Sequence, residues 1–140
     1  MNKNDEYESL VSERDSTQAK HDASQRRIDG YTAQLDRLYP IKEIISTQKG
    51  NFDTLRKNTD KVLDAERSWK GVNYDTYITE GGWLSDENLA FRDKSLDLVL
   101  DSLNNRITEI ENLRNNEYGI LGKLASALNS LCNKIENFFN

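Results

Sequence analysis

The side chains that most often carry metal or redox chemistry are scarce in this sequence. Among 140 residues there is one cysteine, Cys132, and one histidine, His21. A single cysteine excludes an internal disulfide, and these two residues make no plausible zinc site, because structural zinc takes four ligands. We therefore expect no metal and no other cofactor. Cys132 is interpreted as a small half-buried residue, with an intermolecular disulfide outside the cell as the alternative.

Acidic pairs are the remaining residues that could do acid–base chemistry. Glu109 lies two positions before Glu111, and Asp97 lies four before Asp101, which are spacings that a solvated helix face supplies routinely. The sequence has no glycine-rich phosphate loop, paired histidines, CxxC pair or nucleophile elbow. We therefore predict a protein that is not an enzyme and acts by binding.

The charge distribution narrows the class of partner. The first 70 residues hold 13 basic and 13 acidic side chains, whereas the last 70 hold 6 and 11. Nucleic-acid binding needs concentrated positive charge, so we expect no nucleic-acid partner. No run approaches twenty apolar residues and no secretory signal begins the chain, which predicts no stable membrane insertion and a cytoplasmic location.

A long helix is expected over about residues 5–68. Residues 3–27, which include its beginning, form a polar arm that we expect to be helical but weakly anchored. Apolar residues then recur at helical spacing: Ile28, Tyr31, Leu35, Leu38, Ile45, Phe52, Leu55, Thr59, Val62 and Leu63. Pro40 removes one backbone hydrogen bond inside this pattern, which predicts a kink, with a break into two helices as the alternative.

A turn is expected over residues 69–84. The segment contains both tryptophans, Trp69 and Trp83, together with Gly71, Tyr74 and the Gly81-Gly82 pair. Each glycine costs about 1 kcal/mol relative to alanine inside a helix, so consecutive glycines favour a turn. We predict that the Trp69 indole packs across the helix ends. Whether this motif is a recognition signal or only a structural plug is left open.

A second helix is expected over about residues 85–138, with Ser85 as its N-cap. Numbering the heptad from Leu96 as position a, the apolar a and d residues are Leu96, Val99, Leu103, Ile110, Leu113, Ile120, Leu124, Ala127, Leu131 and Phe138. Position e is also apolar, at Leu100, Ile107, Leu121, Leu128 and Ile135. Because a and d suffice for one seam, we predict that the e residues bind a partner chain.

These patterns predict an all-α, elongated, antiparallel two-helix hairpin that forms a single domain over residues 1–140. Each helix of a lone hairpin buries only one seam, and that burial must offset roughly 1 to 2 kcal/mol of backbone ordering per residue. We therefore expect the hairpin to complete a helical bundle with a partner.

Two long helices joined through Trp69-x-Gly71, with Tyr74 and Tyr77 behind it, resemble the WXG superfamily of type VII secretion substrates. The layout is most similar to the LXG-associated α-helical proteins, including the YwqH-like group. In two respects the sequence differs from the family pattern. The turn is longer, and the YxxxD/E export signal expected after the second helix is absent, because the chain ends Glu136-Asn137-Phe138-Phe139-Asn140.

The resemblance implies a targeting, chaperone-like factor that binds the helical N-terminal domain of an LXG toxin. It implies export by the type VIIb secretion system of a Gram-positive bacterium, with a second small helical accessory protein and the secretion ATPase as further partners. The chain itself would be cytoplasmic or exported with the toxin by a non-Sec route. Two other interpretations are a homo-oligomeric coiled-coil scaffold and a peripheral membrane helix protein, although the basic face typical of membrane-surface helices is missing.

Overall fold

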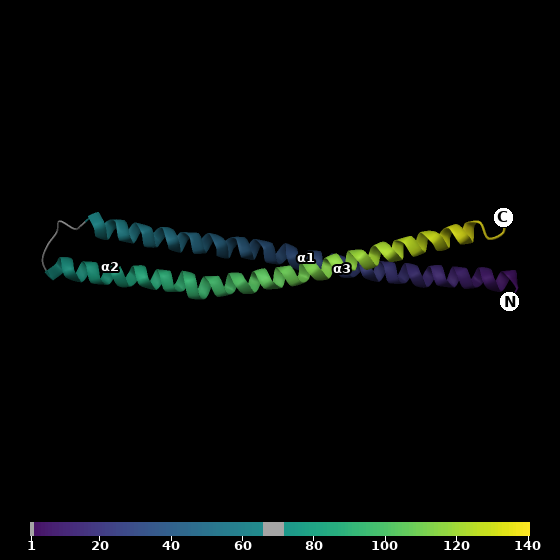
Figure 1. Cartoon of the computed structure of the whole chain (residues 1–140), viewed down its shortest axis with the longest axis horizontal. Coiled ribbons are helices and arrows are strands. Elements are labelled where there is room, and N and C mark those ends of the chain that lie inside the picture. The colour runs from purple at the N-terminus through teal and green to yellow at the C-terminus, as the bar shows by residue number, and fades with distance from the viewer. Residues whose placement is uncertain (1, 66–71) are drawn as a thin grey trace. The chain divides into compact units, whose positions relative to one another are not determined.

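The computed structural model describes the backbone of residues 2–65 and 72–140, and the side chains of residues 2–61, 79–84, 86, 87 and 89–140. Its elements in chain order are α1 (Lys3–Ala65), α2 (Val72–Ala90), the π-helix η1 (Phe91–Leu96) and α3 (Asp97–Glu136). Figure 1 labels α1, α2 and α3. No strand occurs in these two backbone ranges, which confirms the all-α class.

Helix α1 continues through Pro40 without interruption. The alternative of two separate helices meeting at this proline is therefore wrong. A proline in a helix interior removes one backbone hydrogen bond and introduces one clash. The long runs of helix-forming residues on both sides are sufficient to keep the same helix going.

The length of the chain predicts one domain, whereas the structure divides into two compact units. Unit 1 consists of Met1–Asp36 together with Thr108–Asn140, and unit 2 consists of Arg37–Ile107. Each unit therefore pairs a part of α1 with a later part of the chain, and each is described by itself below.

The core of unit 1 is narrow and contains both apolar and polar side chains. Its buried apolar residues include Ile28, Leu35 and Ile110, with exposed fractions of 2%, 0% and 1%. On α1 the covered positions alternate three and four residues apart all the way from its first turns: Tyr7, Leu10, Arg14, Thr17, His21, Ser24, Ile28, Tyr31 and Leu35. The polar arm is thus helical as expected, and it follows the same seam as the apolar stretch.

The end of unit 1 is closed by an aromatic cluster. The ring of Tyr7 lies 5.7 Å from that of Phe138 and 5.2 Å from that of Phe139, measured between centroids. Offset aromatic pairs at these distances stabilise beyond their buried area. The cluster fixes the beginning of α1, which the sequence predicted to be weakly anchored.

In unit 2, α2 begins earlier than the predicted second helix. It starts at Val72, so the turn expected over residues 69–84 is wrong from residue 72 onward, and Ser85 lies inside the helix instead of capping it. The Gly81-Gly82 pair is helical, and a Cβ added at Gly82 would meet nothing within 4 Å. Tertiary context overrides a glycine propensity of about 1 kcal/mol each.

The π-helix η1 joins α2 to α3. Its end is marked by the amide of Asp97, which donates to the carbonyl of Arg92, five residues back instead of four. Covered positions run 89, 92, 96, 100 and 103, so two steps of four replace the regular alternation of three and four. The wider turn accommodates this one extra residue and keeps the covered face continuous.

On α3 the covered seam differs from the predicted one. From Leu96 at the end of η1 to Phe138 just beyond α3, positions a and e are covered, at Leu96, Leu100, Leu103, Ile107, Ile110, Arg114, Glu117, Leu121, Leu124, Leu128, Leu131, Ile135 and Phe138. The d residues Val99, Leu113 and Ile120 are exposed by 44%, 39% and 46%. The d series also contains Ala127 and two cations, Arg106 and Lys134, whereas e holds five large apolar residues, so covering a with e buries more apolar surface.

Candidate protein-interaction surfaces

A buried polar layer crosses unit 1. Glu117 occupies an a position of α3 and is 7% exposed, and Ser24 of α1 is fully buried beside it. The Ser24 hydroxyl donates to Glu117 Oε1 at 2.7 Å, and Arg27 Nε donates to the same oxygen at 3.0 Å. A second guanidinium nitrogen of Arg27 lies 2.9 Å from it. One carboxylate oxygen therefore joins two α1 residues that lie three positions apart.

The two charged partners of this buried polar layer differ in their exposure to solvent. The hydrogen bond from Arg27 lowers the pKa of Glu117 below its ordinary value of 4.5, the bond from Ser24 lowers it further, and burial opposes both. Arg27 itself keeps 51% of its side chain in solvent. A buried carboxylate held by a half-exposed guanidinium fits a structural role, because polar residues in a helical seam select one register over others.

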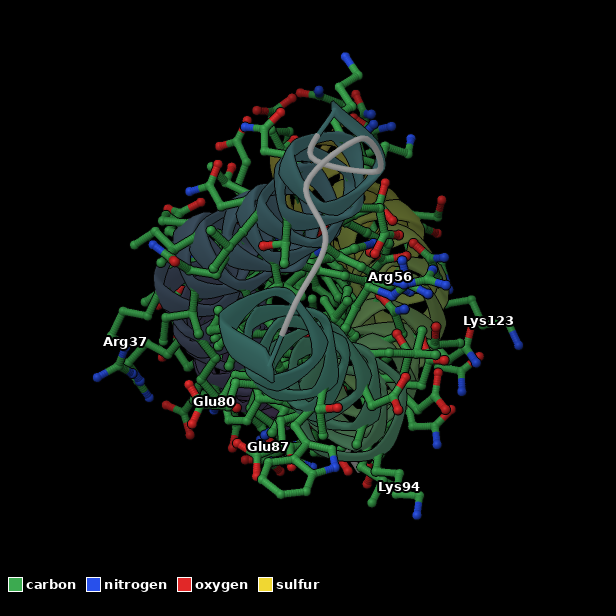
Figure 2. The ribbon with its side chains drawn as sticks, turned by 90° about the vertical axis from the view of Figure 1, so that its left-hand side faces the viewer. Arg37, Arg56, Glu80, Glu87, Lys94 and Lys123 are labelled. Carbon is green, nitrogen blue, oxygen red and sulfur yellow. The ribbon has the colours of Figure 1, made fainter. Side chains whose placement is uncertain are left out.

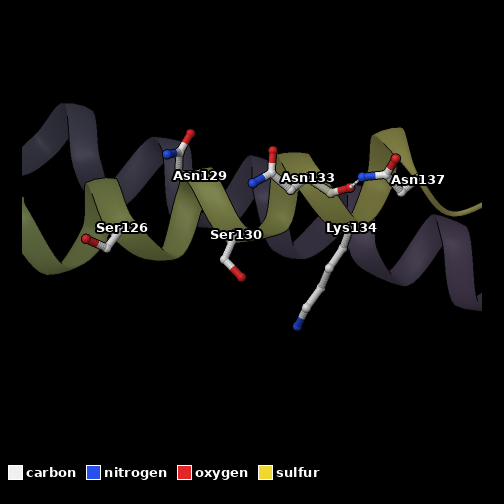
Figure 3. Close-up of a pocket in the computed structure, with 6 residues that line it drawn as sticks. All are labelled: Ser126, Asn129, Ser130, Asn133, Lys134 and Asn137. Carbon is white, nitrogen blue, oxygen red and sulfur yellow. Dashed lines mark hydrogen bonds between the residues drawn. The ribbon is translucent and has the colours of Figure 1, made fainter.

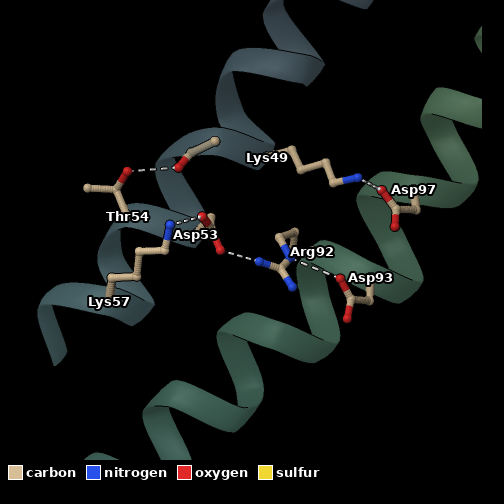
Figure 4. A network of polar contacts seen from close by, with 8 residues as sticks. Lys49, Asp53, Thr54, Lys57, Arg92, Asp93 and Asp97 are labelled. Carbon is tan, nitrogen blue, oxygen red and sulfur yellow. Dashed lines mark hydrogen bonds and ion pairs between the residues drawn. The ribbon is translucent and has the colours of Figure 1, made fainter. Parts of the chain in front are cut away.

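Unit 2 has a charged cluster where α1 meets η1 and the start of α3 (Figure 4). Arg92 of η1 forms an ion pair with Asp53 of α1 and donates to the neighbouring Asp93 at 2.9 Å. Lys57 approaches the other Asp53 oxygen at 3.1 Å, and Lys49 pairs with Asp97. The hydrogen bond from Lys57 lowers the pKa of Asp53, and the charge of Arg92 acts in the same direction.

An aromatic contact lies beside this cluster. The rings of Phe52 in α1 and Phe91 in η1 are 4.7 Å apart between centroids and tilted by 44°. Phe52 and Asp53 are consecutive, as are Phe91 and Arg92, so each helix presents one aromatic and one charged side chain. One turn of α1 and one turn of η1 therefore make both the aromatic contact and the ion pair.

The residues of the predicted turn motif lie in different parts of the chain's structure. Trp69 and Gly71 lie outside the described residues. Tyr74 belongs to α2 by its backbone, and its side chain is outside the described part. Trp83 also belongs to α2 and is 65% exposed, so its predicted position in a turn is wrong.

The five predicted partner-binding residues are not exposed as the sequence analysis supposed. Ile107 is 4% exposed, and Leu100, Leu121, Leu128 and Ile135 are half-buried, because position e belongs to the covered seam. Contact of these residues with another chain remains a prediction. A partner would meet first the side chains that the seam leaves uncovered.

Large apolar side chains remain exposed on every helix of unit 2. They are Tyr39, Ile41, Ile44 and Leu55 on α1, Trp83 and Leu84 on α2, Phe91 on η1, and Leu98 and Val99 on α3. Ile44 and Leu98 are exposed by 59% and 66%. Charged side chains of the same unit, including Arg37, Glu80 and Lys94, point away from the helices (Figure 2). Exposed apolar surface is thus interspersed with solvated charge.

Unit 1 has a different surface, which we call the outer face of α3. It comprises the exposed c, d and g positions of the last part of the helix: Asn112, Leu113, Asn116, Gly119, Ile120, Lys123, Ser126, Ala127, Ser130, Asn133, Lys134 and Asn137. An open hollow toward its end is lined by side chains that include Ser126, Ser130 and Lys134 (Figure 3). Glu109 lies one turn before Leu113, and Asn116 lies between Leu113 and Ile120.

Sequence reasoning missed this face for an identifiable reason. The heptad pattern predicts Leu113 and Ile120 in the internal seam. A comparison of positions d and e separates them, since two cations, Arg106 and Lys134, interrupt the d series, whereas one, Arg114, interrupts the e series.

The described part of the chain offers no metal cluster and no membrane span. It contains no group of three or more His, Cys, Asp or Glu side chains able to hold a metal ion. Among its helices, none combines the length and apolar character that crossing a bilayer requires.

Comparison with known proteins identified no relative. No protein-family model, curated protein or solved structure matches the chain.

Proposed function

We propose that this chain is a non-enzymatic targeting factor that binds the helical N-terminal domain of an LXG toxin and promotes its export by a type VIIb secretion system. The proposal combines the resemblance carried by Trp69-x-Gly71 between two long helical regions with the almost entirely helical character of the described residues.

The observation that carries the binding role is the exposed apolar surface of unit 2. Nine large apolar side chains there are more than a third exposed, on helices that already share a covered seam. Large exposed apolar side chains on a helical unit are candidates for contact with another chain. Helices with a second apolar flank are typical of bundles completed by another chain.

The architecture in this proposal is an antiparallel two-helix hairpin, with α1 as one arm and α2, η1 and α3 as the other, and with a kink near Pro40. The toxin domain would add helices to this hairpin. A second small helical accessory protein and the secretion ATPase are the further partners, and the chain would stay cytoplasmic or leave with the toxin by a non-Sec route.

The test is export of the toxin from a strain that lacks this chain. Deletion should abolish secretion of the adjacent LXG toxin and leave secretion of an unrelated type VII substrate unchanged, and the intact gene should restore it. Normal toxin secretion in the deletion strain would contradict the proposal.

The Trp69→Ala variant in the same assay separates the two roles considered for the motif. A folded variant that no longer restores export supports recognition. A folded variant that restores export fully leaves only a structural role for Trp69.

A further inference from the structure

An uncharged strip lies along the exposed side of α1 in unit 2. Nine residues of this part of the helix are exposed, carry no charge and fall on one side of the helix, and we call them the α1 strip. They are Pro40, Ile41, Ile44, Thr47, Gln48, Asn51, Thr54, Leu55 and Asn58. The strip is roughly 27 Å long at about 1.5 Å per residue, in a chain of which 31% of the residues are charged.

The surface of the strip is more apolar than its composition suggests. Ile44 and Leu55 are exposed by 59% and 45%. The hydroxyls of Thr47 and Thr54 donate to main-chain carbonyls four residues earlier, at 2.9 and 3.0 Å. Because both hydroxyls are satisfied within α1, these threonines contribute their methyl groups to the surface. Ile44 and Thr47 also border an open hollow in it.

The order of side chains along the middle of the strip is the same in both directions. Ile44, Gln48, Asn51 and Leu55 read apolar, amide, amide, apolar, at steps of four, three and four residues. Antiparallel pairing with a second copy, about a twofold axis beside Gly50, sets Ile44 opposite Leu55 of the second copy. The same axis sets Gln48 opposite Asn51 of the second copy, and it repeats each pair. Amides that face each other can satisfy their donors and acceptors, and polar pairs in a helical seam fix its register.

The charges that border the strip match the same axis. Glu43 lies seven residues before Gly50 and Lys57 lies seven after it, on the same edge of the strip. Each Glu43 therefore lies opposite Lys57 of the second copy, and the Lys57 side chain is 71% exposed. A Cβ added at Gly50 would meet nothing within 4 Å, so the space at the axis is open. Beyond the strip, charges of both signs follow at each end: Asp36 and Arg37 before it, and Asp60 and Lys61 after it.

We infer that the α1 strip is the contact surface for a second copy of this chain, paired antiparallel about a twofold axis beside Gly50. Matched apolar, amide and charged pairs in one register favour this occupant. A contact limited to one helix of each copy lies at the small end of interface sizes, so we expect a weak dimer with a Kd of about 10–100 µM. The inference does not depend on the proposed function, since the exposed apolar residues of α2, η1 and the start of α3 stay uncovered.

The apolar pair is tested by sedimentation equilibrium of the full chain over a range of concentrations. The average mass of the wild type should rise from that of the 16.1 kDa monomer toward twice this value. Ile44→Asp should weaken the dimer at least about tenfold, because the substitution occurs twice in each dimer. Leu98→Asp is the matched control, since Leu98 is exposed by 66% in the same unit but lies on α3 outside the strip. It should dimerise as wild type, and circular dichroism should show unchanged helicity in both variants.

The charged pair gives a test that is specific for a twofold self-contact. Glu43→Lys sets a lysine opposite Lys57 of the second copy, and Lys57→Glu sets a glutamate opposite Glu43 of the second copy. Each variant alone should therefore be monomeric where the wild type dimerises. An equimolar mixture of the two variants places opposite charges at both positions and should restore the dimer.

Four outcomes would overturn the inference. A wild-type chain that stays monomeric up to about 500 µM would exclude the expected dimer. Wild-type dimerisation of Ile44→Asp would place the self-contact on another surface, and charge variants that stay monomeric when mixed would refute the antiparallel alignment. A monomeric wild type whose binding to the LXG toxin domain is weakened by Ile44→Asp would assign the strip to that domain and leave the proposed function standing.

Discussion

Changing Glu117 to glutamine tests the buried polar layer of unit 1 with almost no change in shape. The amide oxygen can still accept from Ser24 and Arg27, but the negative charge is lost. Hydrogen bonds to charged groups contribute about 1.5–3 kcal/mol, against about 0.5–1.5 for neutral ones. Because half of the Arg27 side chain is in solvent, we expect the lower end of the difference, a loss of about 1 kcal/mol in the free energy of unfolding at pH 7.

The pH dependence gives a second, independent readout. The pKa of Glu117 is lower in the folded chain than its ordinary value of 4.5, so the unfolded chain binds the proton more readily. The stabilising contribution is therefore complete above about pH 5 and is lost as pH falls through the folded pKa. The difference between wild type and Glu117→Gln should stay constant above about pH 5 and shrink below it.

The assay is urea unfolding followed by circular dichroism at a series of pH values. Glu8→Gln, at an exposed position of α1 in the same unit, is the matched control and should follow wild type. A Glu117→Gln variant as stable as wild type at pH 7, with the same decline in acid, would refute the role given to this layer.

Three further predictions use thermal or urea unfolding. Ile110→Ala should cost about 2–5 kcal/mol, whereas Ile120→Ala should cost less than about 1 kcal/mol, and equal losses would contradict the observed seam. Glu117→Leu should lower the melting temperature by more than Glu117→Gln does, because it leaves the buried Ser24 hydroxyl and the Arg27 guanidinium without the oxygen that accepts from both, and a melting temperature equal to that of wild type would argue against this. Phe91→Ala should cost about 1–2 kcal/mol through the lost contact with Phe52, less than a fully buried phenylalanine would, and no change would disprove that contact's contribution.

The helical class and much of the α1 stripe could be predicted from sequence. Ile28, Leu35 and Ile45 recur at spacings that only a helix brings to one face. The same logic failed at Leu55, which is 45% exposed although it shares the apolar pattern. Two flanks of one helix can both be apolar, and periodicity alone does not decide which is covered.

The seam of the polar arm could not be found by apolar periodicity. Arg14, Thr17, His21 and Ser24 occupy its covered positions, and a polar residue gives apolar periodicity nothing to detect. The buried Glu117 was hidden in the same way, because its hydrogen-bond partners lie about ninety positions away.

Local propensity misplaced the start of the second helical region. Gly81-Gly82 and Trp83 favour a turn when taken alone, yet α2 includes all three. Helix formation is cooperative and depends mainly on packing, so an unfavourable pair costs less than ending the helix. The π turn at η1 could be recognised only once the covered positions were known.

The most direct test of the account is thermal unfolding of the purified chain with and without the helical N-terminal domain of the LXG toxin that it is proposed to bind. A partner that binds only the folded chain adds about 2.7 kcal/mol of stability at a free concentration one hundred times its Kd. We predict a melting temperature that rises with toxin-domain concentration and a heteromeric complex in native mass spectrometry. A melting temperature independent of the toxin domain, with a stable homo-oligomer as the only species, would contradict the proposed function.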